Sequence, residues 1–446
     1  MKIFGIRLLF IIFLSVTNNI FCAENQEIVK RFDFGNGKTE PGFQQVTGNM
    51  IYNADRGFGF ICEDDVRNVV RKDKNKIKQD FCTSKKPFYF VVDIPEGFYE
   101  IRITFGDKDS STITTVKAES RRLMLERVET GRGEFITKSI NVNVRTPKIN
   151  ENEKIRLKSR EINYLNWDNK LTLEFNNSRP CVNAVEIIKR NDLITVFLAG
   201  NSTVVDQEKE PWCSWGQMIP RFLGHEVVVA NYAESGEALK SFQSEKRLDK
   251  ILSVMKPGDY LFIEFGHNDQ KPNSSSYVEP FTGYKDELKK MVKAAREKGG
   301  IPVIISSTQR RSFNEDGNII NTHGDYPLAA KLTAKEENVP FIDLTAMSTQ
   351  IYESLGIEVS KKAFVHYPAN SFPGQDKDLA DNSHFSPYGA YEIAKCILIG
   401  IQKCNLPLAN YILSDFSGYD PQHPDEPGDW NLPSSPSFEI LKPDGY

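Results

Sequence analysis

The residues best suited to chemistry lie in two short stretches that are far apart in the chain. Gly200-Asn201-Ser202 follows an apolar, β-branched run, and Asp381-Asn382-Ser383-His384 precedes a segment with helical spacing. A serine hydroxyl attacks an ester only when a base takes its proton, and an imidazole can take that proton and return it. A carboxylate three residues before the histidine can hold its other ring nitrogen. Ser202, His384 and Asp381 are therefore a candidate triad for acyl transfer.

Each stretch also has a simpler interpretation. A glycine followed by polar residues is a common turn, in which Gly200 lets the backbone turn sharply without a Cβ clash. A histidine at the start of a helix is often bonded only to a backbone carbonyl. Two further polar stretches favour the chemical interpretation: residues 231–236 (NYAESG) and 266–269 (GHND) each follow an apolar run directly. Ligands of open α/β sheets bind at such strand ends.

The elements that must position these stretches alternate between strand and helix. Apolar runs predict strands over residues 193–198, 226–230, 259–264, 301–306 and 340–344. Helical spacing predicts helices over residues 214–223, 237–255, 281–298, 328–338 and 386–403. Alternation of this kind implies a parallel five-stranded sheet covered on both faces, which is a three-layer α/β/α domain over residues 193–410.

The first half of the chain follows a different pattern. Residues 25–190 alternate or cluster β-formers between turn residues, which predicts an all-β sandwich or jelly roll. Pro95-Glu96-Gly97 separates two of these runs as a hairpin loop would, and the charged residues 64–78 are expected to form a solvated loop. The tail, residues 411–446, is rich in Pro, Asp and Ser. It is expected to be either disordered or packed as an extended arm.

The N-terminus predicts export. Residues 1–23 combine Lys2 and Arg7 with a short apolar run, which is typical of a secretory signal peptide. Export would place the protein in the periplasm, at the cell surface or outside the cell. Cys22 offers the alternative of a lipoprotein, although the residues before it make a poor lipobox. The six cysteines after Ala23 show no C-x-x-C spacing, so no structural zinc site is predicted, and their disulfide connectivity stays open.

Charge and hydropathy limit the partners. The formal charge of −4 gives no reason to expect nucleic acid or an anionic membrane surface. No further membrane segment is expected after the signal is removed. The chain is long enough for two domains.

The four polar stretches resemble the consensus blocks of the SGNH (GDSL) hydrolases, in order and at suitable spacing over residues 193–404. Within that superfamily, AGNSTV, WGQM and FGHNDQ resemble the rhamnogalacturonan acetylesterases. The resemblance implies a flavodoxin-like domain and the triad Ser202, Asp381 and His384. It also implies an oxyanion hole made of the Ser202 and Gly236 N–H groups and the Asn268 amide, with no metal or cofactor. Asn201 stands where the superfamily usually has Asp, and Ser235 stands where a second glycine is expected.

Substrate contacts are expected at the rim of the predicted cleft. Trp212 and Trp215 offer aromatic faces that suit sugar rings, and Arg310 and Arg311 suit the carboxylates of uronic acids. Core packing for the tryptophans and solvated charge for the arginines remain the alternative. The N-terminal domain resembles the galactose-binding-like β-sandwiches attached to carbohydrate enzymes. It is expected either to bind glycan or only to pack against the catalytic domain.

Together these observations predict an exported serine esterase that removes acetyl groups from a pectic polysaccharide, specifically rhamnogalacturonan, through an acetyl-serine intermediate. One alternative keeps the chemistry and changes the ester to acetylxylan, a sialic acid or a lipid. The other is a carbohydrate-binding protein that has lost activity. The sugar position, the oligomeric state and the role of the tail are left open.

Overall fold

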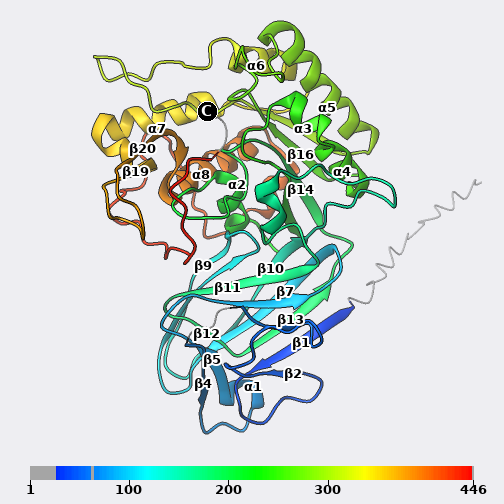
Figure 1. The fold of residues 1–446 in the computed structure, drawn as a ribbon, viewed down its shortest axis with the longest axis vertical. Coiled ribbons are helices and arrows are strands. Elements are labelled where there is room, and N and C mark those ends of the chain that lie inside the picture. Colours follow the sequence, from blue (N-terminus) through cyan, green and yellow to red (C-terminus); the bar gives the residue numbers. More distant parts are fainter. Residues whose placement is uncertain (1–26, 62–64, 444–446) are drawn as a thin grey trace, which may run out of the picture.

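The structure is a computed structural model that describes residues 27–61 and 65–443. It consists of an all-β domain joined to an α/β domain (Figure 1). The predicted signal peptide, with Cys22, lies outside the described residues, and so does Cys62. Within the described part, no helix is long and apolar enough to cross a membrane. The cysteines of the described part are free thiols.

The N-terminal domain is a β-sandwich, as predicted. Its two larger sheets have the strand orders β10-β7-β13-β1-β2 and β3-β6-β11-β8-β9, and a small sheet has the order β12-β5-β4. Inward-facing aromatic residues from both sheets form the core, where Phe32 and Phe34 meet the edge of Phe90 at ring-centroid distances of 5.0 and 4.8 Å. The strands and the one helix are β1 Ile28–Phe34, β2 Gln44–Val46, β3 Phe58–Phe60, β4 Arg67–Val70, α1 Lys76–Gln79, β5 Asp80–Thr83, β6 Phe88–Asp93, β7 Gly97–Gly106, β8 Thr112–Ala118, β9 Arg122–Thr130, β10 Phe135–Val144, β11 Lys170–Arg179, β12 Cys181–Val182 and β13 Ala184–Lys189.

Two predictions for this domain were wrong. The turn at Pro95-Glu96 does not close a hairpin, because β6 and β7 lie in different sheets and the chain crosses between them there. The charged stretch 64–78 is not one loop, since it contains β4 and the start of α1. β4 has the sequence RNVV and forms the edge of the small sheet, where Val69 pairs with Phe81, so a charged stretch here includes a partly exposed edge strand.

The second domain has the predicted three layers. Its sheet is parallel with the order β15-β14-β16-β17-β18. One face of the sheet packs against α2, α7 and α8, and the other packs against α3, α4, α5 and α6. The elements are β14 Ile194–Gly200, α2 Trp215–Met218, β15 Val227–Asn231, α3 Leu239–Ser244, α4 Arg247–Val254, β16 Tyr260–Glu264, α5 Lys285–Glu297, β17 Ile301–Ile305, α6 Tyr326–Glu336, β18 Phe341–Ile342, α7 Leu344–Val359, β19 Phe364–Tyr367, β20 Leu379–Phe385 and α8 Pro387–Lys403.

The strand order places a switch point at β14. The strand pairs with β15 on one side and with β16 on the other, so the connection that follows β14 and the one that follows β16 leave the carboxyl edge of the sheet in opposite directions. The short helical turns that complete the chain are η1 Ser159–Asn163, η2 Ile219–Phe222, η3 Pro280–Tyr284, η4 Ser360–Ala363 and η5 Pro407–Tyr411. The switch point is where a ligand cleft is expected, and Ser202 directly follows it.

Three helical predictions need correction. The helix predicted over 237–255 is broken at Lys246, whose φ of 65° is left-handed and separates α3 from α4. The helix predicted over 214–223 is only a four-residue α2 continued by η2, because Pro220 interrupts it. The hairpin of β19 and β20 was not predicted, and it places Asp381 and His384 on a strand rather than at a helix entry.

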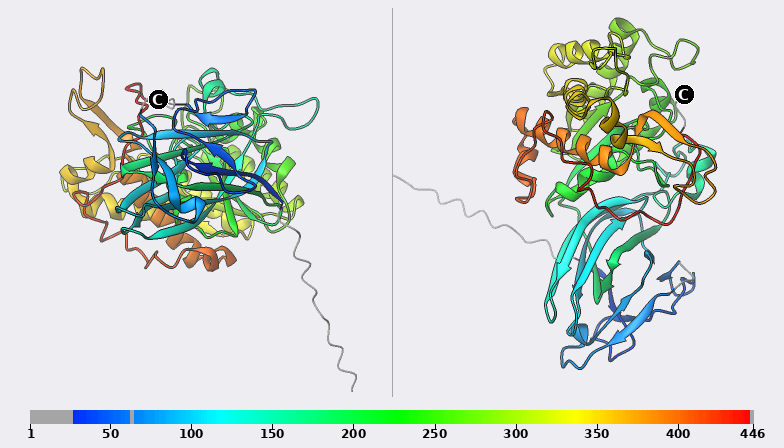
Figure 2. Two further views of the ribbon diagram at one scale, coloured as in Figure 1. Left: turned by 90° about the horizontal axis from the view of Figure 1, so that it is seen from below. Right: turned by 90° about the vertical axis from the view of Figure 1, so that its left-hand side faces the viewer.

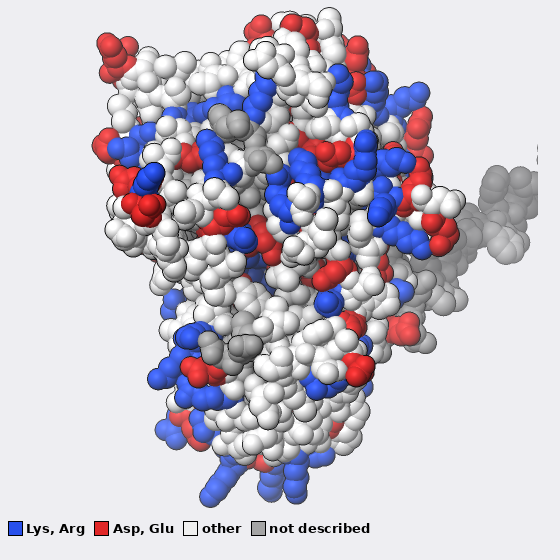
Figure 3. Space-filling model, in the orientation of Figure 1, with Lys and Arg blue, Asp and Glu red and all other residues white. Residues whose placement is uncertain are grey.

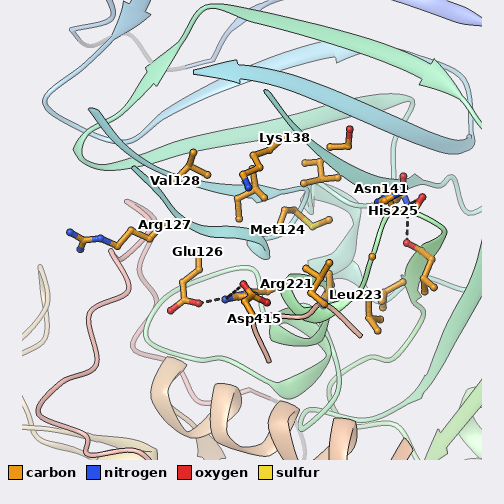
Figure 4. A pocket seen from close by; sticks show the side chains of 18 of the residues that line it. Met124, Glu126, Arg127, Val128, Lys138, Asn141, Arg221, Leu223, His225 and Asp415 are labelled. Carbon is orange, nitrogen blue, oxygen red and sulfur yellow. Dashed lines mark hydrogen bonds and ion pairs between the residues drawn. The ribbon is translucent and has the colours of Figure 1, made fainter. Parts of the chain in front are cut away.

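The two domains meet across a polar seam that is largely buried. Arg122 Nε lies 2.8 Å from Asp206 Oδ2, and Arg121 Nη2 lies 2.7 Å from Glu210 Oε1, with all four side chains almost fully buried. At one end of the seam is a cavity of about 490 Å³ (Figure 4). There Arg221 is held between Glu126 and Asp415, and none of the predicted site residues lines this cavity.

The tail packs as an extended arm, which was one of the two predicted alternatives. It follows the junction of the domains (Figure 2), where the ammonium of Lys117 donates to Pro433 O at 2.9 Å and to Ser435 Oγ at 2.7 Å. On the face in Figure 3, basic and acidic side chains are interspersed over the α/β domain. A group of basic side chains projects from the far end of the β-sandwich in the same view.

Candidate active site

The carboxyl end of β14 presents Ser202. Gly200 is the last residue of the strand and has no positive φ, so the reason for glycine is space and not a special turn conformation. A Cβ added there would lie 2.5 Å from Val204 Cγ2. The chain then turns tightly, with Val204 N and Val205 N both donating to Asn201 O at 3.0 Å. This turn holds Ser202 at the strand end with 5% of its surface exposed.

The structure brings the three residues of the predicted triad together. Ser202 Oγ lies 2.9 Å from His384 Nε2, and His384 Nδ1 lies 2.8 Å from Asp381 Oδ2. The other carboxylate oxygen of Asp381 accepts from the backbone N–H of Ser383 at 2.7 Å and of His384 at 3.1 Å. The carboxylate is therefore fixed at both oxygens before it holds the imidazole.

The Asp381 carboxylate is ionised at neutral pH. Burial alone would raise its pKa, but the hydrogen bond and charge of His384 and the N–H of Ser383 outweigh burial and hold the pKa at about 2. The ammonium of Lys442, from the tail, lies 3.4 Å from the same carboxylate and acts in the same direction. A fixed negative charge beside Nδ1 favours the tautomer whose Nε2 accepts a proton from Ser202.

Asp381→Asn is expected to keep the fold and to lower kcat by about 10²–10³, because the imidazolium loses its charged partner while the oxyanion donors stay in place. The measurement is kcat for acetate release, with Asp376→Asn in the exposed loop of the same hairpin as the matched control. A kcat close to that of the native protein would show that Asp381 only shapes the turn.

The predicted oxyanion donors lie on three neighbouring loops. Gly236 has a φ of 83°, which favours glycine. Within the described part of the chain, the N–H groups of Ser202 and Gly236 donate to no protein acceptor. Asn268 Nδ2 donates to Glu237 O at 2.9 Å, which leaves its second amide hydrogen for a ligand. Gln207 Nε2 ties two of the loops together, since it donates to Ser202 O at 3.0 Å and lies 3.5 Å from Ser235 Oγ.

A buried carboxyl group supports the turn that carries Ser202. Glu264 ends β16, and its oxygens lie 2.9 Å from Thr203 Oγ1 and 2.5 Å from Trp215 Nε1. Thr203 Oγ1 also lies 3.0 Å from Asn201 Oδ1. One hydroxyl proton cannot serve both oxygens, so a protonated Glu264 fits best, donating to Thr203, which donates to Asn201. Complete burial raises the pKa of Glu264 to about 7, although the hydrogen bonds that Trp215, Thr203 and the backbone of Thr308 can donate to the ionised carboxylate act in the opposite direction.

This raised pKa predicts a pH-dependent stability. The pKa rises from 4.5 to about 7 on folding, so the stabilising contribution of the protonated carboxyl is complete below pH 4.5 and is lost as the pH rises through about 7. Glutamine mimics the protonated form. We expect Glu264→Gln to unfold with a free energy about 1–3 kcal/mol larger than that of the native protein above pH 7, and equal to it at acid pH.

Urea unfolding of both proteins across this pH range tests the Glu264 prediction. Glu297→Gln, on the surface of α5, is the matched control and should change nothing at either end of the range. A difference between Glu264→Gln and the native protein that does not vary with pH would contradict the protonated state of Glu264.

The four predicted substrate contacts are placed differently from one another. Trp215 is fully buried in the core with its N–H on Glu264, so its assignment to the cleft rim was wrong. Trp212 is 4% exposed, with its ring edge-on to His384 at a centroid distance of 5.8 Å and its N–H on Glu439 O at 2.9 Å. It therefore packs beside the base, which leaves little of its face for a sugar.

The two arginines are half-buried. Arg310 donates to Thr322 Oγ1 at 3.0 Å. Arg311 donates to Ser360 Oγ and to Asn382 Oδ1, both at 3.0 Å, and so braces the strand that carries Asp381. Contact of either arginine with a uronic acid remains a prediction.

Several residues near the site were not predicted. The turn between β8 and β9 contacts the chain just after Ser202, where Arg121 donates to Gln207 O at 3.1 Å and to Trp212 O at 2.8 Å. The connection between β10 and β11 contacts the loop of Gly236 through Lys158 and Arg160. Their only sequence signal is a basic composition, which does not distinguish a solvated charge from one buried against another domain.

In the described residues, no cluster of three or more side chains suited to hold a metal ion is present.

Comparison with known proteins agrees with this architecture. Residues 195–390 match the GDSL-like Lipase/Acylhydrolase family, and residues 30–134 match the Beta-agarase/YXIM esterase-like, galactose-binding domain-like family. Rhamnogalacturonan acetylesterase RhgT of Bacillus subtilis is 43% identical over 223 residues, which are 50% of this chain and 95% of that protein. The probable rhamnogalacturonan acetylesterase YesY of the same organism is 36% identical over 49% of this chain and 98% of its own length.

A third relative covers both domains. The uncharacterized esterase YxiM of Bacillus subtilis is 28% identical over 355 residues, which are 76% of this chain and 85% of that protein. The match to RhgT extends over nearly the whole of that enzyme at high identity. The chain therefore belongs to the GDSL-like lipase/acylhydrolase family and is an SGNH-type ester hydrolase that resembles the rhamnogalacturonan acetylesterases.

Proposed function

We propose that the protein is a serine acetylesterase that removes O-acetyl groups from a pectic polysaccharide, with rhamnogalacturonan as the substrate. The observation that carries this proposal is the continuous chain from Ser202 Oγ through His384 to Asp381, with contacts of 2.9 and 2.8 Å. Beside it are the N–H groups of Ser202 and Gly236, which have no acceptor among the residues that the structure describes. The names of RhgT and YesY support the choice of substrate.

The first half of the reaction transfers the acetyl group to the enzyme. His384 Nε2 takes the proton of Ser202 as Oγ attacks the acetyl carbonyl carbon, and the carbonyl oxygen becomes an oxyanion. The N–H groups of Ser202 and Gly236 and the amide of Asn268 stabilise that charge. The tetrahedral intermediate then collapses. The sugar oxygen leaves with the proton from His384, and acetyl-Ser202 remains.

The second half of the reaction repeats these steps with water. His384 takes a proton from a water molecule that attacks the acetyl carbon, and the same donors stabilise the second oxyanion. Collapse of this intermediate returns the proton to Ser202 Oγ and releases acetate. Asp381 keeps its charge throughout and stabilises the imidazolium that forms in each half.

Acetate release from a panel of esters tests the proposal. Acetylated rhamnogalacturonan oligosaccharides are expected to give the highest kcat/KM, with acetylated xylan and acetylated sialic acid lower. A series of p-nitrophenyl esters is expected to show falling rates with longer acyl chains. A higher kcat/KM on acetylxylan or on long-chain esters would overturn the pectic substrate, and glycan binding without turnover of any acetyl ester would overturn the esterase.

We also propose that the protein is exported, on the strength of the signal pattern in residues 1–23. N-terminal sequencing of the protein from its native host tests this proposal. A mature chain beginning just after Ala23 supports a secreted protein, one beginning at a lipid-modified Cys22 supports a lipoprotein, and an unprocessed Met1 overturns export.

A further inference from the structure

One connection of the β-sandwich domain reaches the loop that follows β15. This connection runs from β10 to β11, and Arg156 N donates to Glu245 O at 3.0 Å beside the junction of α3 and α4 (Figure 1). Further along it, Lys158 Nζ donates to Ser235 O at 2.6 Å and Arg160 Nη2 donates to the same oxygen at 2.7 Å. Two cations from one domain thus converge on a single carbonyl of the other.

That carbonyl belongs to the peptide unit whose N–H is on Gly236. A trans peptide is planar, so its C=O and N–H point in opposite directions, and whatever fixes the oxygen also fixes the direction of the N–H. The φ of 83° at Gly236 sets only the rotation between this peptide unit and the Cα of Gly236 that follows it. Charged donors on the oxygen also draw electron density from the amide, which makes its N–H a stronger donor.

The two cations are themselves held in place. Arg160 Nη2 lies 2.7 Å from Glu234 Oε1, and Lys158 Nζ lies 2.6 Å from Glu237 Oε1. Both carboxylates are almost fully buried, whereas the cations are only about three-quarters buried. The backbone oxygen of Glu237 accepts from Asn268 Nδ2, so the Lys158–Glu237 pair also anchors the residue that holds the Asn268 donor.

We propose that Lys158 and Arg160 are positioning residues that orient and polarise the Ser235–Gly236 peptide, so that the β-sandwich domain helps to build the oxyanion hole of the neighbouring domain. This inference rests on the proposed function, in which the Gly236 N–H meets the oxyanion. It gives the β-sandwich domain a part in the reaction that does not depend on glycan binding.

The test replaces the charges while keeping side-chain length, in Lys158→Met, Arg160→Met and the double variant. Losing a whole oxyanion donor costs about 10²–10³ in kcat, so weakening one donor should cost about 10-fold in each single variant and about 10² in the double variant. KM is expected to stay unchanged, because the peptide acts on the transition state. Inactivation by paraoxon, whose phosphoryl oxygen needs the same donors, should slow by the same factors.

Conservative variants and a matched control separate positioning from simple packing. Lys158→Arg and Arg160→Lys keep a cation near Ser235 O and should retain most of kcat. Lys154→Met, an exposed lysine of the same connection, should leave kcat, KM and the paraoxon rate unchanged. If the double variant does not fold, Arg160→Met combined with Glu234→Gln removes both members of one ion pair and should still lose about 10-fold in kcat.

Three results would overturn the inference. One is an unchanged kcat and paraoxon rate in folded variants, and a second is a rise in KM with kcat retained, which would indicate a packing or substrate-binding role. In either case, loss of activity in Ser202→Ala would leave the proposed function standing. The third is retained activity in Ser202→Ala, which would overturn the proposed function and this inference with it.

Discussion

Ser202→Ala is expected to lower kcat for acetate release by about 10⁶, the scale seen when a hydrolase loses its nucleophile. The alanine removes the oxygen that lies 2.9 Å from His384 Nε2, which is the hydroxyl that this base deprotonates in the proposed reaction. KM should change little, because the hydroxyl contributes to the reaction rather than to binding. The residual rate should come from the oxyanion donors acting on water alone.

The measurement is acetate release at saturating substrate by Ser202→Ala and by Ser275→Ala, an exposed serine of the same domain. The control should keep the native kcat. A Ser202→Ala rate within tenfold of the native rate would exclude a covalent intermediate on this residue, and it would favour a mechanism in which His384 activates water directly.

His384→Ala is expected to cost about as much as Ser202→Ala, and the double variant should cost no more than either, because the two side chains act as one unit. The imidazole is 1% exposed, and its Nε2 lies 2.9 Å from the Ser202 hydroxyl oxygen. Imidazole added to the solution should partly restore kcat in His384→Ala, since a small base can enter the vacated space.

The outcome that contradicts this account of His384 is additivity. If the fold loss in kcat of the double variant equalled the product of the two single losses, the two residues would contribute independently. The proposed proton transfer from Ser202 to His384 would then be contradicted. His423→Ala, an exposed histidine on the tail, is the control and should show no loss and no response to imidazole.

The fold was predictable because its signals are local. Runs such as the one ending at Gly200 are apolar on both faces of the sheet, and the helices between them carry one apolar stripe, so strand and helix alternate visibly in the sequence. Two wrong helix predictions arose where the backbone conformation of a single residue interrupts the helical spacing of apolar residues. Lys246 adopts a left-handed backbone within a helical pattern, and Pro220 ends one. The β19–β20 hairpin was missed because the long connection 368–378 separates its strands, and because β20 contains Asp381, Asn382 and Ser383, which are residue types that strands disfavour.

The site was predictable only in part, for a related reason. The types and spacing of Ser202, Asp381 and His384 carry chemical information, and the structure places the three within hydrogen-bond distance of one another. The residues that support the triad are far from it in the sequence, and their types do not distinguish them from ordinary surface or core residues. Lys158 looks like any solvated lysine until its contact with Ser235 is seen, and Trp215 looked like a rim aromatic although it is fully buried.

Peptide mapping after inactivation by paraoxon, combined with acetate release from acetylated rhamnogalacturonan, tests the central claim most directly. The proposed function predicts one phosphoryl group per chain, attached to Ser202, and a loss of acetate release in proportion to the fraction of chains modified. Complete modification of Ser202 with acetate release intact, or complete inactivation with the phosphoryl group on another residue, would contradict it.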